Sequence, residues 1–354
     1  MTEPQVTIVV VPREQFSKAE ASLASIYAAT SLPFALVYVD GNSPPPLRDY
    51  LAMEAALRGF TLVRTERYLV ANEARNLGLR HVRTPYVAFV DNDVLVQPGW
   101  LEALLRCAEE TGAWAVGPVV CVDQRGAPMV HYTGADIRIV EEKGYRGLTY
   151  APHVSRCPLA EASDLRRERY DLVKFYCMLV RTEVFDRVGP LDEEVLCFFE
   201  AADFALSIQA AGGSTYFEPG AVVTHTLPPP LPWSDMTYFL LRWSNAWLRS
   251  AMRHFARKHG FVPDHPDLRS HVRWRSAHRR RLLPPLLWDL LRTRPMKYPA
   301  KIVDRVLFDG LLEHVIVRPA ERVRRGQTSP PTPEPARTRP VPPTGSTESW
   351  GGAR

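Results

Sequence analysis

Short apolar runs alternate with helical patterns over the first 120 residues of the chain. The apolar runs are continuous and do not alternate with polar positions, which is typical of parallel strands that helices cover on both faces. Gly59 and Gly112 end two of the helical patterns between them. The pattern therefore predicts an α/β protein with a mostly parallel sheet. Strands are expected at 6–11, 34–39, 60–64, 86–90 and 114–119, and helices at 47–58, 71–82, 98–111 and, capped by Ser17 with Glu20, after the first strand.

The rhythm changes in the second part of the chain. Residues 121–172 are expected to form irregular or small-sheet structure over one edge of the core. A single helix is predicted over 233–258, where Trp243 and Trp247 stand one helical turn apart. Between these segments the sequence predicts a strand at 175–180, helices at 182–188 and 200–211, and a strand pair that ends at His225.

Charge is distributed unevenly along the chain, although the net charge is only +5. Residues 1–240 carry 21 Lys and Arg against 30 Asp and Glu, whereas residues 241–325 carry 20 against 7. Such asymmetry predicts different partners for the two parts. The basic part mixes Leu and Trp with its arginines, as a peripheral contact with anionic lipid would require. The alternative is a solvated helical face packed on the acidic part. Nucleic-acid binding is not favoured, because no recognition motif accompanies the charge.

Cysteine usage and the N-terminus indicate a compartment. The five cysteines are scattered, with no CxxC pair and no zinc-ligand spacing, which favours a reduced cytosolic setting. The first apolar run is too short for a signal peptide or a membrane span. The sequence therefore predicts a cytoplasmic protein that could meet a membrane only at its inner face.

Acidic side chains follow two of the expected strands. Asp40 ends one, and Asp91, Asn92 and Asp93 end another. Ligands of open α/β sheets bind at the carboxyl ends of the strands, and residues two apart in extended chain project to one side. Mg²⁺ or Mn²⁺ takes one or two such carboxylates and leaves positions for phosphate oxygens. The alternative is that one aspartate caps the following helix while the other is solvated.

Several short motifs occur in a fixed order around these acids. They include NEARNLGL at 72–79, TPYVAFVDND at 84–93, VGPLDE at 188–193, FEAADF at 199–204 and, last, PGA at 219–221 before His225. Together they resemble the family 2 glycosyltransferases of GT-A fold, over roughly residues 5–258. The resemblance implies a Rossmann-like sheet and a domain of residues 1–258. A basic, partly helical extension would then span 259–325, and a disordered tail with seven prolines would span 326–354.

The resemblance also implies roles for individual residues. Asp91 would lie near the ribose and the metal-bound diphosphate and would count among the metal residues, and Asp93 would bind Mn²⁺ or Mg²⁺ directly. His225 matches a position that often adds a metal or diphosphate contact, although a lone histidine at a strand end is otherwise more often structural. The remaining matches imply a nucleotide contact for Asp40 and a lining of the donor pocket by Arg75 and Asn76.

The base that the resemblance implies is a carboxylate of the segment 199–204. This chain departs from the pattern, because Ala201 stands where a second acid is usual. Glu200 and Asp203 remain, three residues apart and on one face of a helix that begins there. Glu200 is the favoured base, with Asp203 as the next candidate or as a helix anchor.

These features predict a metal-dependent glycosyltransferase of hexosyltransferase type. It would move a sugar from a nucleotide-diphosphate donor to a hydroxyl acceptor, with inversion, in the synthesis of a glycan or glycoconjugate. The acceptor could be a glycan, a lipid-linked molecule or a small molecule. Ala201 motivates a rival, a catalytically degenerate binding or scaffold protein. A sugar nucleotidyltransferase is a second rival, but residues 12–16 lack the glycines expected after its first strand.

Overall fold

The structure of the protein is a computed structural model. It describes residues 3–326 except 125, 143–144, 154–156, 227–230, 263–265 and 292. The tail for which the sequence predicts disorder therefore lies, apart from Gly326, outside the described residues.

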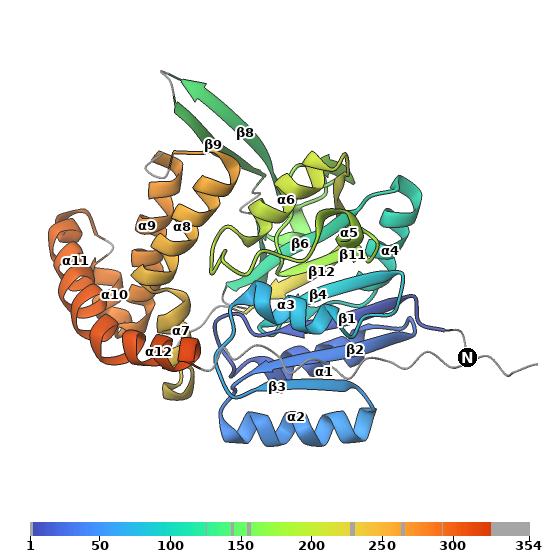
Figure 1. Ribbon diagram of the computed structural model, residues 1–354, viewed down its shortest axis with the longest axis horizontal. Helices are drawn as coiled ribbons and strands as arrows, with labels where there is room; N and C mark the ends of the chain where they lie inside the picture. Colours follow the sequence, from blue (N-terminus) through green and yellow to red (C-terminus); the bar gives the residue numbers. More distant parts are fainter. Residues whose placement is uncertain are drawn as a thin grey trace, which may run out of the picture.

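A ten-stranded sheet forms the centre of the described chain (Figure 1). Its main order is β10-β12-β6-β11-β4-β1-β2-β3, with β5 paired to β12 and β7 paired to β6. The strands are β1 (Val6–Val11), β2 (Phe34–Gly41), β3 (Thr61–Thr65), β4 (Tyr86–Asp91), β5 (Val94–Val96), β6 (Ala115–Gln124), β7 (Ala127–Tyr132), β10 (Glu168–Tyr170), β11 (Cys177–Arg181) and β12 (Thr215–His225). A separate hairpin pairs β8 (Gly134–Glu142) with β9 (Tyr145–His153).

Strands β4, β1, β2 and β3 run parallel, as the continuous apolar runs predict. Val11 pairs with Asp91 across β1 and β4, so the chain that leaves β1 and the acids that end β4 meet at one edge of the sheet. β11 is antiparallel to β4 and β6, whereas β6 and β12 are parallel. The mostly parallel α/β sheet is confirmed.

The helices of the sheet domain pack around this core. They are α1 (Ala19–Ala29), α2 (Pro45–Arg58), α3 (Ala71–Leu79), α4 (Trp100–Thr111), α5 (Val184–Val188) and α6 (Glu200–Ala210). The expected Ser17 cap is wrong: α1 begins at Ala19 without a side-chain cap, and the Ser17 amide donates to Asp235 Oδ2 at 3.1 Å. The stretch 121–172, for which irregular or small-sheet structure is expected, contains β7 to β10 and forms a β-rich lobe.

The predicted helix over 233–258 is two helices, α7 (Trp233–Arg242) and α8 (Asn245–His259). Ser244 lies between them in extended conformation, and its Oγ accepts the Trp247 amide at 3.1 Å. A serine that caps a new helix explains the break. Four more helical stretches follow beside the sheet domain (Figure 1): α9 (Pro266–Arg279), α10 (Pro285–Leu291), α11 (Lys297–Val303) with the π-helix η4 (Asp304–Val317), and α12 (Arg318–Gly326). Among the described residues, no helix combines the length and apolar character that crossing a membrane would require.

Helix α3 approaches the sheet most closely at Gly78. A Cβ built there would lie 2.3 Å from Val9 Cγ1, and Val9 is a fully buried residue of β1. Alanine normally favours a helix over glycine by about 1 kcal/mol. Here the clash with a stiff β-branched side chain outweighs that preference.

We therefore expect Gly78→Ala to lower the free energy of unfolding by about 1–3 kcal/mol, measured by urea denaturation. Val9→Ala should relieve the clash, so the double variant should be less destabilised than the two single losses added together. Additive losses would show that the Gly78 contact does not limit the packing of α3.

Candidate active site

Asp91 ends β4 in a fully enclosed ion-pair cluster. Arg75 Nη2, on α3, donates to Asp91 Oδ1 at 2.9 Å, and Arg13 Nε lies 3.4 Å from Oδ2. Burial raises the pKa of Asp91 to about 6, although both arginines act in the opposite direction. The two guanidinium groups also stack over aromatic rings, Arg13 over Tyr176 and Arg75 over Phe175, each at 4.0 Å from the ring centroid. The arginines are thus held in place at the edge of the sheet.

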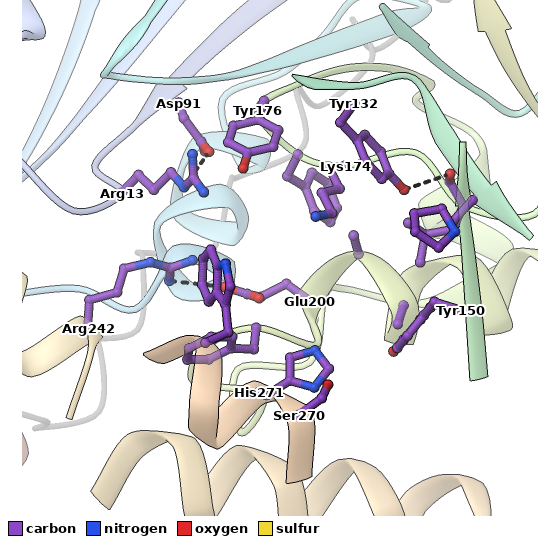
Figure 2. A pocket seen from close by; sticks show the side chains of 18 of the residues that line it. Arg13, Asp91, Tyr132, Tyr150, Lys174, Tyr176, Glu200, Arg242, Ser270 and His271 are labelled. Atoms are coloured by element: carbon purple, nitrogen blue, oxygen red, sulfur yellow. Dashed lines mark hydrogen bonds and ion pairs between the residues drawn. The ribbon is translucent and has the colours of Figure 1, made fainter. Parts of the chain in front are cut away.

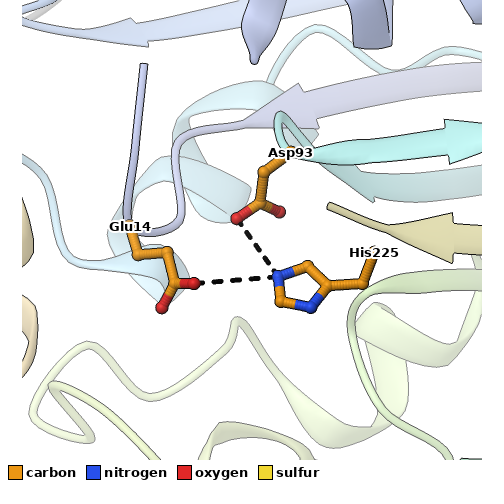
Figure 3. Close-up of side chains that lie close together, drawn as sticks. All are labelled: Glu14, Asp93 and His225. Carbon is orange, nitrogen blue, oxygen red and sulfur yellow. Dashed lines mark ion pairs between the residues drawn. The ribbon is translucent and has the colours of Figure 1, made fainter. Parts of the chain in front are cut away.

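Asp93 lies in a second cluster, with Glu14 and His225 (Figure 3). His225 Nε2 is 3.4 Å from Asp93 Oδ2 and 3.7 Å from Glu14 Oε1. Both carboxyl side chains are fully buried, and neither has a hydrogen-bond partner among the described residues. Buried carboxylates without partners are costly, and a cation in their midst removes that cost.

The donor set of this cluster fits a divalent metal. It offers carboxylate oxygens and one imidazole nitrogen, and one ligand atom from each residue lies within 4.8 Å of the others. Carboxylates suit Mg²⁺ and Mn²⁺, and an added imidazole suits the softer Mn²⁺ better. Asp93 and His225 are two of the residues for which the sequence predicts metal binding. Asp91, the third, lies instead in the cluster with Arg13 and Arg75.

A cavity of about 540 Å³ opens beside these clusters (Figure 2). The edge of the sheet supplies Arg13, Arg75 and Asp91 to its lining, and the first turn of α6 supplies Glu200. Aromatic side chains line other parts of the wall, contributed by the β-rich lobe, by the segment before α6 and by the C-terminal helices: Tyr132, Tyr150, Phe198, Trp243 and Trp274. The cavity therefore joins the acidic sheet edge to an aromatic wall.

Glu200 is paired with an arginine of α7. Arg242 Nη1 donates to Glu200 Oε1 at 3.0 Å, and both side chains are buried. Burial opposes ionisation of Glu200, but Arg242 and Arg75 outweigh it and hold the pKa below its usual range. Glu200 is therefore a carboxylate at neutral pH, with Oε1 already bonded. Phe198, two residues before it, has a φ of 69°, a strained value for a bulky residue, and it packs edge-on against Trp243.

Asp203 is on the same helix but is engaged elsewhere. Its carboxylate accepts from His259 at 2.7 Å and from Lys258 at 2.9 Å, both on α8, and it does not line the cavity. Asp203 thus ties α6 to α8.

The other two predicted nucleotide contacts also lie outside the cavity lining. Asp40 accepts the amide and hydroxyl of Ser43, each at 2.9 Å, and forms an ion pair with Arg64. Asn76 holds the turn after α5, because its amide donates to Leu191 O at 2.8 Å and its Oδ1 accepts the Leu191 amide at 3.0 Å.

Several residues of the site were not anticipated. Arg13 and Glu14 follow β1 directly, so their place after a buried parallel strand was a usable signal. No sequence signal marks Arg242, Trp274 and His278. They belong to C-terminal helices, and the way these helices dock beside the sheet leaves no local pattern in the sequence. His278, on α9, lies 3.4 Å from Glu14 Oε2 through its Nε2. Burial lowers the pKa of His278 despite the nearby Glu14.

Two curated proteins are similar to part of this chain in sequence. The chain is similar to uncharacterized protein y4gI of Sinorhizobium fredii, with 27% identity over 232 residues, which is 63% of this chain and 24% of that protein. It is also similar to the pre-mycofactocin glycosyltransferase of Mycobacterium tuberculosis, with 29% identity over 155 residues, 43% of this chain and 29% of that protein. The match thus spans less than a third of either relative.

The fold is similar to that of a solved glycosyltransferase. The crystal structure of GalNAc-T7 with UDP, GalNAc and Mn²⁺ superposes with a TM-score of 0.50 at 15% identity, over 83% of this chain and 58% of that one. This likeness shows the GT-A fold. The model of glycosyl transferase family 2 matches residues 7–189, more than half of the sequence, and the chain therefore belongs to that family.

Proposed function

We propose that this protein is a metal-dependent, inverting glycosyltransferase of hexosyltransferase type that moves a sugar from a nucleotide diphosphate to a hydroxyl acceptor. The observation that carries the proposal is the buried cluster of Glu14, Asp93 and His225, whose oxygens lack hydrogen-bond partners among the described residues. It lies at the same strand-end edge as Asp91, and Asp91 lines a cavity together with Glu200. GalNAc-T7, whose fold is similar, was crystallised with UDP and Mn²⁺, which is in keeping with this proposal.

Glu14, Asp93 and His225 would hold Mn²⁺ or Mg²⁺, which when bound neutralises charge on the leaving diphosphate. The chain adds fixed positive charge of its own at the sheet edge, because Arg13 and Arg75 line the cavity. Asp91 keeps both guanidinium groups in place. We propose that Arg75 and Asp91 contact the donor's phosphate and ribose side, with Asp40 toward the base and Asn76 shaping the pocket through the turn it holds.

Glu200 would be the base that takes the proton of the acceptor hydroxyl. It is the carboxylate of α6 that lines the cavity, whereas Asp203 does not. Arg242 bonds Oε1, which fixes the carboxylate and leaves Oε2 to accept the proton. The low pKa that Arg242 imposes makes Glu200 a weak base. Its contribution to the rate of transfer would therefore come from its position beside the acceptor more than from its base strength.

A thermal-shift screen of nucleotide sugars with and without Mn²⁺ tests the proposal. Because a ligand of the native state raises apparent stability, the matching donor should raise the melting temperature by several degrees only when Mn²⁺ is present. Slow release of free sugar from that donor would then show transfer to water. Binding without any turnover, with or without acceptors, would favour the degenerate scaffold that Ala201 suggested, and release of pyrophosphate from a nucleoside triphosphate would favour a nucleotidyltransferase.

We also propose that the outer face of the C-terminal helices contacts anionic lipid from the cytoplasmic side of a membrane. Two arginines of α9 are not available for this, since Arg275 and Arg279 are buried and Arg279 donates to Asp309 of η4 at 2.8 Å. The helices α11, η4 and α12 instead present a stripe of exposed apolar residues along one continuous stretch, with basic neighbours beside it. The apolar members are Tyr298, Ile302, Val306, Leu311, Val315 and Val323, and the exposed basic neighbours are Lys301, Arg305, Arg318 and Arg322.

Charge reversal at two of these positions tests the lipid contact. Each basic residue near an anionic surface contributes about 1 kcal/mol, so Lys301→Glu with Arg305→Glu should weaken co-sedimentation with phosphatidylserine vesicles by at least roughly 30-fold. Ile302→Ser should weaken it further, whereas Leu57→Ser, at a residue of α2 that is 74% exposed, should not. Wild-type protein that ignores phosphatidylserine vesicles would refute the proposal.

A further inference from the structure

Helix α9 lies far along the chain from the residues that match the family, which end at 189. Its last turn nevertheless reaches the metal cluster. His278 is 5% exposed, and its Nε2 lies 3.4 Å from Glu14 Oε2, while the other oxygen of Glu14 faces His225 at 3.7 Å. Glu14 therefore stands between two histidines, one from the sheet domain and one from the C-terminal helices.

The ring of His278 is fixed by aromatic neighbours. Phe239 and Trp274 stack on it with interplanar angles of 19° and 20°, and the centroid of the Trp243 ring lies 4.1 Å away. These contacts leave the ring little freedom to turn. Its Nε2 has no hydrogen-bond partner among the described residues at the present separation from Glu14. The nitrogen is thus held in place, buried, and aimed at one oxygen of Glu14.

We propose that His278 is a positioning residue for the metal: its Nε2–H holds Glu14 Oε2 so that Oε1 points at the site shared with Asp93 and His225. This inference rests on the proposed metal-dependent function and adds to it a role for the C-terminal helices, which complete the metal site. A group that orients a metal ligand typically changes metal affinity by about 10–100-fold. Binding of the metal and docking of α9 are then coupled, and the coupling acts equally in both directions.

Mn²⁺ affinity, measured by the EPR signal of free Mn²⁺, tests the role without using activity. His278→Phe keeps an aromatic ring against Phe239 and Trp274 but removes the donor, and we expect it to raise the apparent dissociation constant at least 10-fold. His278→Gln places an amide N–H near the position of Nε2 and should restore affinity to within about threefold of wild type. His314→Phe is the matched control, since His314 is exposed in the same helical extension and bonds only its own helix at Gly310 O.

Two further comparisons separate failure of this inference from failure of the metal site itself. If His278 acts through Glu14, Glu14→Gln with His278→Phe should bind Mn²⁺ no worse than Glu14→Gln alone. Wild-type affinity in His278→Phe, with weakened binding in Asp93→Asn, would overturn the role of His278 and leave the metal site standing. Wild-type affinity in both variants would refute the metal site as well.

Hydrogen exchange of the wild-type protein gives a test that does not depend on a variant folding. Mn²⁺ should slow the exchange of α9 amides near His278, because metal binding and helix docking stabilise each other. The amides of α2, on the far side of β3, serve as the internal reference. Exchange in α9 that does not respond to saturating Mn²⁺ would contradict the coupling.

Discussion

Replacing Asp93 with Asn should abolish Mn²⁺-dependent turnover, with a loss of at least about 1,000-fold in kcat/KM, and should weaken Mn²⁺ binding beyond detection at micromolar concentrations. Asn keeps the shape of the side chain but removes the charge that attracts the ion. Because the Asp93 carboxylate is buried with no hydrogen-bond partner among the described residues, the same change should stabilise the metal-free protein. Loss of function together with a higher melting temperature is expected of a residue that binds a ligand and destabilises the ligand-free protein.

Differential scanning calorimetry with and without Mn²⁺ checks this expectation. Wild-type protein should melt at a higher temperature with Mn²⁺, whereas Asp93→Asn should melt at the same temperature in both conditions, above that of the metal-free wild type. Asp164→Asn, at an exposed aspartate outside the cavity lining, is the control and should behave as wild type. Unchanged turnover in Asp93→Asn would show that Asp93 does not bind the metal.

The sequence predicted most of the sheet because each buried strand is marked by an apolar run within its own few residues. Continuous apolar runs such as Val6–Val11 and Tyr86–Asp91 report burial on both faces, and burial on both faces implies parallel strands between helices. Because ligands bind at the carboxyl ends of parallel strands, the sequence also predicts Asp91 and Asp93 at one ligand-binding edge of the sheet. In the β-rich lobe around the hairpin β8–β9 the sequence predicts small-sheet structure only as one of two possibilities and places no individual strand, because these strands are partly exposed and mix charged with apolar positions.

Most of the site residues that the sequence did not predict lack such a local signal. The position of Glu14 after a buried strand was a usable signal, but its proximity to Asp93 follows from the register that brings the end of β1 beside the end of β4. Arg242 and His278 depend on how α7 and α9 dock beside the sheet, and that docking is set by tertiary contacts such as the Tyr238 hydroxyl of α7, which donates to Pro12 O after β1 at 3.2 Å. Sequence spacing carries no record of such contacts. The sequence pattern therefore identified the strand-end acids and the helical extension, but not which residues of the C-terminal helices reach the site.

The two acids of α6 should respond differently to loss of charge. Glu200→Gln should lower kcat for transfer by about 100- to 10,000-fold, the usual contribution of a general base, with little change in donor affinity. Asp203→Asn should keep kcat within a few-fold of wild type, because Asp203 faces Lys258 and His259 outside the cavity lining. It should instead lower the free energy of unfolding by about 2 kcal/mol, since it weakens charge-assisted bonds between α6 and α8.

Steady-state kinetics with a matched donor, together with urea denaturation of both variants, separates these outcomes. Glu200→Gln also leaves Arg242 buried beside a neutral amide, so its stability must be measured and its kinetics taken below its unfolding transition. A variant that folds, binds donor as wild type does and fails only in transfer identifies Glu200 as the base. Full activity in both variants would place the base elsewhere on the cavity wall. Activity lost in Asp203→Asn alone, with its fold intact, would reverse the assignment and mean that α6 and α8 move apart when the acceptor binds.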